Sequence, residues 1–349
     1  MRIPFRPQGV PVSRASPAFL VSTGVPARAA SAGRAGWSGV VRRADGWRGL
    51  LGIALLAACR GAPHAAPATL QRDVSQETLL AAPVTLPSDT IAYGPLPLQV
   101  GELRLPPGRG RVPVLVVVHG GCWLAQYDRS YLRAAAEAFT RDGWATWTIA
   151  YRRIGDEGGG WPGTLDDVGR AVDHVRALAA REPRLDTTRV VVAGHSAGGH
   201  LALWVASRRA GERLDDAPAP VGDEAPPLRV HGALGLAAIT DLAGYAAPRG
   251  CGSAVRRLLG GEPASQPSRL ALASPVARLP LGVRTRLVVG EADRIVPRSQ
   301  GDTLVARAAA RGERIVQSIV PGATHFDVVA PQSVAWPAVR QAARSLLPR

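Results

Sequence analysis

The residues best suited to chemistry lie in the segment Gly194-His195-Ser196-Ala197-Gly198, which has the pattern Gly-x-Ser-x-Gly. It follows the apolar run 190–193 and precedes a stretch that favours a helix. A strand, this pattern and then a helix form the context of a sharp turn that presents a nucleophilic serine. Glycine suits both flanks because a turn this tight leaves no room for a Cβ atom. Ser196 is therefore the candidate nucleophile.

An activated serine needs a general base and an acid that orients this base. Downstream, an apolar run ending at Gly290 opens into a loop with Glu291 and Asp293, and a later run opens into a loop with His325. Both loops follow the ends of expected strands, where open α/β sheets place their sites. The loop sequence and the Val-Pro that follows favour Asp293 over Glu291 as the acid. The other six histidines fit structural positions better, so His325 is the candidate base.

The tetrahedral intermediate of acyl transfer needs backbone N–H donors for its oxyanion. The apolar run 112–119 leads into His119-Gly120-Gly121-Cys122-Trp123, a loop of the type that supplies such donors. We expect the N–H groups of Gly121 and Cys122 to serve, together with that of Ala197, which follows the serine. His119 and Gly120 are expected to support this loop.

These motifs resemble those of the α/β-hydrolase superfamily, in the esterase/lipase branch that includes kynurenine formamidase-like proteins and acyl esterases. The loop 119–123, the segment 194–200 and the histidine loop 322–327 carry the resemblance, which covers about residue 96 to the C-terminus. Relatives of hormone-sensitive lipase usually have a further glycine where this chain has Cys122, which favours the formamidase-like and small-esterase side. The resemblance implies a serine hydrolase with the triad Ser196, Asp293 and His325.

The rest of the chain alternates strand and helix patterns, which indicates a doubly wound, mostly parallel α/β sheet. Residues 241–279 could add a short lid-like insertion over the site. Trp123, Trp161 and Tyr245 are candidates for lining the substrate pocket, although a tryptophan more often packs in a core. We expect strands at 99–105, 112–119, 145–151, 190–193, 232–239, 285–289 and 314–320, and helices at 130–142, 165–181, 198–209, 298–311 and 337–347.

The N-terminal residues indicate export. Arg42, Arg43 and Arg48 precede the apolar run 49–56, which is too short to span a bilayer and ends in Leu-Ala-Ala-Cys at Cys59. This pattern resembles a bacterial lipobox, so we expect lipidation of Cys59 and an anchor in the cell envelope. A simple signal peptide, with a periplasmic or secreted product, and an unusual membrane anchor are the alternatives. The expected organisation is 1–40 over-extended or disordered, 41–59 signal peptide with lipobox, 60–95 linker and first edge strand, and 96–349 α/β-hydrolase catalytic domain.

Export also bears on the cysteines. With Cys59 lipidated, Cys122 and Cys251 remain as an even number in an oxidising compartment. A disulfide between them would tie the oxyanion loop to the segment around Cys251. The sequence leaves this pairing open, because it does not give the distance between the two Cα atoms.

Composition excludes several other classes of function. The formal net charge is +15, but residues 1–58 contain eight arginines and a single acidic residue, and the basic residues are all arginine. This usage indicates GC-rich coding, and no basic helix with interleaved aromatic residues is present, so we expect no nucleic-acid partner. Metal-ligand spacings, a phosphate loop and a dinucleotide fingerprint are also missing, so we expect no cofactor and no metal.

The predicted reaction is hydrolysis of small carboxylic esters through an acyl-enzyme. One alternative is an arylformamidase that cleaves amides of the N-formylkynurenine type, although export counts against it. From another class, the chain could be a non-catalytic, surface-binding lipoprotein with a hydrolase fold. The complete set of triad residues argues against this last reading. The sequence does not indicate an oligomeric state.

Overall fold

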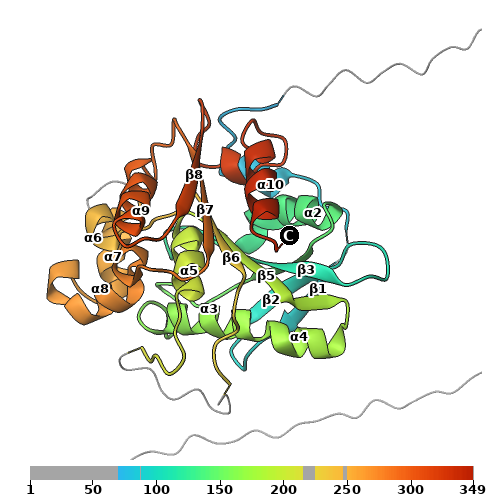
Figure 1. The fold of residues 1–349 in the computed structure, drawn as a ribbon, viewed down its shortest axis with the longest axis horizontal. Helices are drawn as coiled ribbons and strands as arrows, with labels where there is room; N and C mark the ends of the chain where they lie inside the picture. The colour runs from blue at the N-terminus through green and yellow to red at the C-terminus, as the bar shows by residue number, and fades with distance from the viewer. Residues whose placement is uncertain (1–69, 87, 215–224, 247–249, 349) are drawn as a thin grey trace, which may run out of the picture. The chain divides into compact units, whose positions relative to one another are not determined.

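Eight strands form one sheet in the order β1-β2-β4-β3-β5-β6-β7-β8 in the computed structural model (Figure 1). The structure describes residues 70–86, 88–214, 225–246 and 250–348, which lie in the unit Ala65–Arg349. Strands β1 and β2 are antiparallel to their neighbours, and all other pairs are parallel. The strands are β1 Asp89–Ala92, β2 Val100–Arg104, β3 Val112–Val118, β4 Ala145–Ile149, β5 Leu185–His195, β6 Gly232–Leu236, β7 Arg284–Gly290 and β8 Ile315–Val320.

The central strands are apolar on both faces because helices cover both sides of the sheet. In β3, Val114, Val116 and Val118 belong to one core cluster, whereas Leu115 and Val117 belong to the other. This alternation follows from the two-residue period of a strand. It explains why the strands read as continuous apolar runs, and it confirms the predicted doubly wound, mostly parallel sheet.

The helices divide between the two faces of the sheet (Figure 1). One face carries α1 Gln76–Ala81, α2 Arg133–Arg141 and α10 Trp336–Ser345, and the other carries α3 Gly163–Asp173, α4 Val175–Arg181, α5 Ala197–Ala206 and α9 Ser299–Ala309. The segment after β6 adds α6 Leu242–Tyr245, α7 Gly252–Leu259 and α8 Pro267–Ala273. Single 3-10 turns are η1 Arg129–Leu132, η2 Pro263–Ser265, η3 Pro275–Arg278 and η4 Asp327–Val329.

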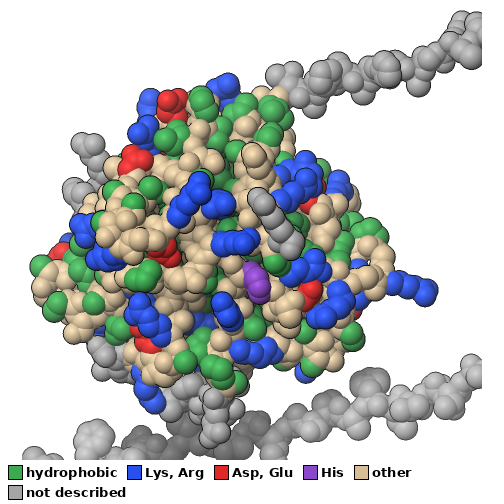
Figure 2. All heavy atoms as spheres, in the orientation of Figure 1, with side chains coloured by type: hydrophobic (Ala, Val, Ile, Leu, Met, Phe, Trp, Pro, Cys, Tyr) green, Lys and Arg blue, Asp and Glu red, His purple; other side chains and the backbone are tan. Residues whose placement is uncertain are grey.

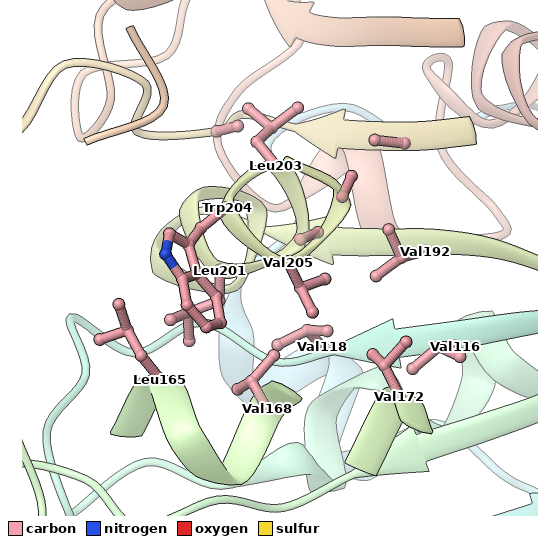
Figure 3. Packing of buried hydrophobic residues seen from close by; sticks show 14 of the residues in the cluster. Val116, Val118, Leu165, Val168, Val172, Val192, Leu201, Leu203, Trp204 and Val205 are labelled. Atoms are coloured by element: carbon pink, nitrogen blue, oxygen red, sulfur yellow. The ribbon is translucent and has the colours of Figure 1, made fainter. Parts of the chain in front are cut away.

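Helix α5 follows the candidate nucleophile and is buried along its whole length. Figure 3 shows Leu201 and Val205 of α5 packed among Val118 of β3 and Val168 of α3. Each fully buried side chain of this kind contributes about 1.5–3 kcal/mol relative to an exposed one. A helix with apolar residues on all sides must be packed against other elements on all sides. This packing fixes the position of the first turn of α5, which follows Ser196.

Several elements differ from the sequence expectations. The helix expected over 130–142 begins as the 3-10 turn η1 and continues as α2, and the strand expected over 232–239 ends at Leu236. The helix expected over 165–181 is two helices, α3 and α4, which meet at His174. The strand expected over 190–193 extends from Leu185 to His195, and its pairing with β3 shifts register between Pro113 and Val114. Neither the break nor the shift has a local sequence signal.

Arginine side chains spread over most of the face shown in Figure 2 and outnumber the acidic ones. Elsewhere in the described chain, arginines pair with carboxylates, such as Arg208 with Asp173 and Arg152 with Asp167, both at 2.8 Å. Within the described ranges, no helix combines the length and apolar character needed to cross a bilayer.

Candidate active site

Ser196 occupies the turn between β5 and α5 with φ 56° and ψ −120°. A non-glycine residue in such a conformation carries backbone strain of about 1–3 kcal/mol, which is typical of functional positions. The flanking glycines permit the turn, because a Cβ on Gly194 would lie 2.0 Å from the carbonyl oxygen of Gly198. A Cβ on Gly198 would lie 2.2 Å from that of Val118. The backbone N–H of Ser196 donates to the carbonyl oxygen of Leu236, which ties the turn to β6.

His325 and Asp293 form a buried pair, with 2.7 Å between Nδ1 of the histidine and Oδ2 of the aspartate. The second oxygen of Asp293 accepts the backbone N–H groups of Ile295 and Val296 at 2.8 and 2.9 Å. Both oxygens of the carboxylate are therefore engaged, which fixes its orientation. Glu291, the other acid considered, is exposed and accepts the backbone N–H of Gly322 instead.

The topology brings these residues to one edge of the sheet. Strands β5 to β8 are parallel neighbours, so their carboxyl ends meet at the same edge. Ser196 directly follows β5, and Asp293 and His325 lie in the loops after β7 and β8. The rings of His195 and His325 have centroids 4.5 Å apart, which places the residue next to Ser196 against the histidine.

A buried hydrogen-bond chain connects the loops on the two sides of Ser196. The N–H of Gly120 donates to Tyr131 Oη at 2.7 Å, and this oxygen lies 2.9 Å from Nδ1 of His195. Nε2 of His195 lies 3.0 Å from the carbonyl oxygen of His325. Because a carbonyl only accepts, Nε2 carries the proton and Tyr131 donates to Nδ1. Burial, aided by the nearby His325, lowers the pKa of His195 well below its usual value, so the ring stays neutral.

Sequence reasoning gave no role to Tyr131 and placed His195 among the six histidines that fit structural positions better than a role as base. His195 has a weak sequence signal, since it ends a buried strand, where a polar side chain needs partners. Tyr131 has none, because η1 reaches the site only through the tertiary fold.

The loop after β3 contains three consecutive residues with positive φ: Gly121 at 99°, Cys122 at 53° and Trp123 at 58°. It packs on the serine turn, since a Cβ on Gly120 would lie 3.1 Å from Ser196 Cβ. The N–H groups of Gly121, Cys122 and Ala197 donate to no protein group in the described part of the chain. Unpaired N–H groups beside a nucleophile are what an oxyanion hole requires.

His119 supports this loop through its contacts with Tyr151 and Gly120. Its ring is fully buried, stacks on Tyr151 with 4.3 Å between ring centroids, and has Nδ1 2.8 Å from the carbonyl oxygen of Gly120. The Tyr151 hydroxyl donates to the carbonyl oxygen of His119 at 2.7 Å. Burial lowers the pKa of His119 to about 3, so the ring is neutral and suits a supporting position.

The interpretation of Trp123 and Tyr245 as pocket-lining residues is wrong in this structure. Trp123 is 0% exposed, and its indole N–H donates to Nδ1 of His200 at 3.2 Å, so it offers no surface to a ligand. Tyr245 is buried, and its hydroxyl bonds the backbone at Ile295 and Cys251. Trp161 is half-buried with Arg269 above its ring, so it stays a candidate for the pocket.

Cys122 and Cys251 form a disulfide with their Cα atoms 5.0 Å apart. The bond joins the loop after β3 to the residue that precedes α7. The predicted lipidation site, Cys59, lies outside the described residues. Within those residues, no group of three or more histidine, cysteine or acidic side chains is arranged to hold a metal ion.

Asp327 holds the histidine loop in place. Its carboxylate is fully buried and accepts the backbone N–H groups of Thr324, Asp73 and Val74, at 2.7, 3.1 and 3.1 Å. A segment far away in sequence therefore braces the turn that contains His325.

Comparison with known structures agrees with this architecture. A carbohydrate esterase from gut microbiota superposes with a TM-score of 0.64 at 20% identity, covering 74% of this chain and 96% of the other. Esterase B from Lactobacillus rhamnosis superposes with a TM-score of 0.63 at 18% identity, covering 78% of this chain and 88% of the other. A bifunctional GH43-CE protein from Bacteroides eggerthii gives 0.61 at 26% identity, covering 73% of this chain but only 37% of that one.

The sheet order, the serine turn and the strand-end loops define a protein of the α/β-hydrolase fold. The profile of the BD-FAE family matches residues 102–307, which is more than half of the chain. The chain belongs to this family. A search of curated proteins gave no match.

Proposed function

We propose that this protein is a serine hydrolase that cleaves carboxylic esters, with Ser196 as nucleophile, His325 as general base and Asp293 as the residue that orients the base. The buried 2.7 Å contact between His325 and Asp293, beside a strained serine turn, is the observation that carries the proposal. The names of similar structures, which include several esterases, support the ester class.

In the proposed mechanism, His325 takes the proton of Ser196 as Oγ attacks the ester carbonyl. Asp293 accepts the N–H at Nδ1 of the histidine, so Nε2 is free to receive that proton, and the carboxylate stabilises the imidazolium. The N–H groups of Cys122, Ala197 and Gly121 donate to the developing oxyanion, and one such donor is typically worth about 3–4 kcal/mol. The protonated histidine then gives its proton to the leaving alkoxide as the C–O bond breaks, which releases the alcohol, and water hydrolyses the acyl-enzyme.

For the substrate we propose short acyl esters, with acylated carbohydrates as the first class to test. Two of the similar structures are named as a carbohydrate esterase and as an acetyl ester-xyloside bifunctional hydrolase. The formamidase reading and the non-catalytic reading draw no support from the comparisons.

The test is ester hydrolysis by the full chain and by Ser196→Ala. We expect release of p-nitrophenol from p-nitrophenyl acetate and butyrate, and of acetate from acetylated xylan. The Ser196→Ala variant should lose at least about a thousandfold in kcat, because no other group can form the acyl-enzyme. Ser268→Ala is the matched control, since this serine is exposed on α8, and it should retain full activity.

Equal rates for wild type and Ser196→Ala would contradict the proposal. Turnover of N-formylkynurenine without any ester turnover would show that the protein is an arylformamidase and not an esterase. Two folded proteins without any activity would favour the binding protein.

For location we propose export to the bacterial cell envelope with a lipid at Cys59. The disulfide between Cys122 and Cys251 supports an oxidising compartment, because disulfides persist there and are rare in the cytosol.

A further inference from the structure

The proposed oxyanion donor at Cys122 belongs to a residue in an unfavourable backbone conformation. Both Cys122 and Trp123 have positive φ, a region that side chains with a Cβ rarely occupy. Trp123 is held by its indole hydrogen bond to His200 and by its carbonyl oxygen, which accepts the N–H of Ile154 at 2.7 Å. Cys122 is held by its disulfide bond to Cys251.

The other end of the disulfide is itself tied to the loop of the proposed catalytic acid. Cys251 is 2% exposed, and its backbone N–H donates to Tyr245 Oη at 3.1 Å. The Tyr245 hydroxyl donates to the carbonyl oxygen of Ile295 at 2.8 Å. The N–H of Ile295 in turn donates to Oδ1 of Asp293 at 2.8 Å. One continuous path therefore runs from the oxyanion loop to the carboxylate that holds His325.

The packing around this path is tight. Gly250 has φ 55°, and a Cβ there would lie 2.5 Å from Tyr245 Oη and 2.7 Å from the carbonyl oxygen of Ile295. Burial, and after it the charge of Asp293, raises the pKa of Tyr245, so the hydroxyl keeps its proton and donates.

We propose that the Cys122–Cys251 disulfide and Tyr245 are positioning residues for catalysis: they hold the Cys122 N–H at the oxyanion and keep this donor in fixed geometry relative to Asp293. This inference rests on the proposed function. An oxyanion donor acts through preorganisation, so the rate depends on how firmly its loop is held. The structure thus assigns a catalytic consequence to the oxidised state of two cysteines that do not touch substrate through their side chains.

The first experiment reduces the disulfide in the full chain. Cys59→Ser serves as the background so that only two cysteines remain, and this variant alone should hydrolyse p-nitrophenyl acetate as fast as the wild type. Dithiothreitol gives up two electrons and two protons, the S–S bond breaks to two thiols, and thiol titration confirms two thiols per chain. Steady-state hydrolysis of p-nitrophenyl acetate is then measured per active site, counted with a p-nitrophenyl phosphonate.

We expect kcat per titrated site to fall about 10- to 100-fold on reduction, with KM changing less than about threefold. Reoxidation should restore kcat. A double variant, Cys122→Ala with Cys251→Ala, should have the same low kcat and should not respond to dithiothreitol. A disulfide that only stabilised the fold would reduce the number of titrated sites but not kcat per site, and this result would overturn the proposal.

The second experiment keeps the disulfide and replaces Tyr245 with Phe. We expect kcat per titrated site to fall about 3- to 10-fold with KM changing less than about twofold, because a looser Asp293 orients His325 less firmly. Tyr93→Phe is the matched control: it also removes a buried hydroxyl that donates to a carbonyl oxygen, that of Ala150, but it does not contact this path. It should leave kcat per titrated site unchanged.

A kcat per titrated site that is unchanged in Tyr245→Phe would remove the tyrosine from the proposal, and the reduction experiment would then test the disulfide alone. Failure of the proposed function gives a different result: the oxidised protein would neither hydrolyse esters nor consume the phosphonate.

Discussion

At the scale of single residues, the site depends on histidines that stay neutral. His119, His195 and His200 are almost fully buried, and burial lowers the pKa of each. His200 accepts the indole N–H of Trp123 and donates to the carbonyl oxygen of Ala273, so both ring nitrogens are used. A charged ring would lose the first of these bonds.

This arrangement makes stability depend on pH. Burial lowers the pKa of His200 to about 4, whereas an unfolded histidine titrates near 6.5. Between these values the unfolded chain binds more protons, so stability present above about pH 6.5 is lost as pH falls towards 4, by up to about 1.4 kcal/mol per unit. His200→Gln keeps one acceptor and one donor without the titration. We expect the wild type to lose about 2 kcal/mol more than this variant between pH 7 and pH 5 in urea unfolding.

If wild type and His200→Gln lost stability equally over this range, His200 would not be neutral in the folded protein. A lower free energy of unfolding of His200→Gln at pH 7 reflects the substitution itself. The comparison therefore uses, for each protein, the change in the free energy of unfolding between pH 7 and pH 5.

Sequence reasoning named the candidate triad residues but not all of the residues that hold them in place. Ser196 and His325 have a motif or a strand-end loop to mark them. Tyr131 acts through contacts with segments that are distant in the chain, and no spacing rule reports such contacts. Trp123 was misread because an aromatic residue beside a catalytic loop has the same sequence signature whether it faces the pocket or the core.

At the scale of elements, a buried ion cluster fastens η1 and α2 to the sheet. Glu102 of β2 bonds Arg104 on its own strand, Arg129 of η1 and Arg133 of α2, at 3.0, 3.2 and 2.8 Å. Burial alone would raise the pKa of Glu102, but the hydrogen bond from Arg133 and the charges of the three arginines lower it. The cluster matters to the site because η1 includes Tyr131.

We expect Glu102→Gln to lower the free energy of unfolding by about 3–5 kcal/mol, since it leaves the buried Arg104 without its countercharge. Chemical denaturation measures this loss. The control is Glu262→Gln, whose pair with Arg256 is 3.6 Å long and exposed, and which should cost less than about 1 kcal/mol. Equal losses in the two variants would show that the cluster contributes no more than a surface pair.

The order and type of the main elements followed from the sequence because the strand runs are long and the helices amphipathic. Their ends were less predictable. The break at His174 and the extension of β5 depend on how neighbouring elements pack, and such packing overrides local propensity.

At the scale of the whole molecule, the N-terminal part of the described chain lies against the histidine loop. Arg72 donates to the carbonyl oxygen of Pro321, and Gln71 bonds the backbone at Gln332 and Val334. Together with the contacts of Asp327, these bonds connect the start of the described chain to the segment that contains His325.

For the full chain we expect processing at Cys59 and lipidation of this residue during export from a bacterial host. Mass spectrometry of the mature N-terminus should show a lipid-modified cysteine, and the protein should partition into a detergent phase. Cys59→Ser should abolish both properties and leave ester hydrolysis intact. An unmodified Cys59 at the N-terminus, or cleavage elsewhere, would contradict the proposed anchor.

The strand order also has a consequence for chains that are cut short. Strands β5, β6, β7 and β8 lie side by side in the order in which they occur in the chain. Under the proposed function, the serine therefore comes first and the histidine follows only the last strand. A chain clipped before β8 would keep its nucleophile and lose its base, so C-terminal truncation alone would switch off hydrolysis.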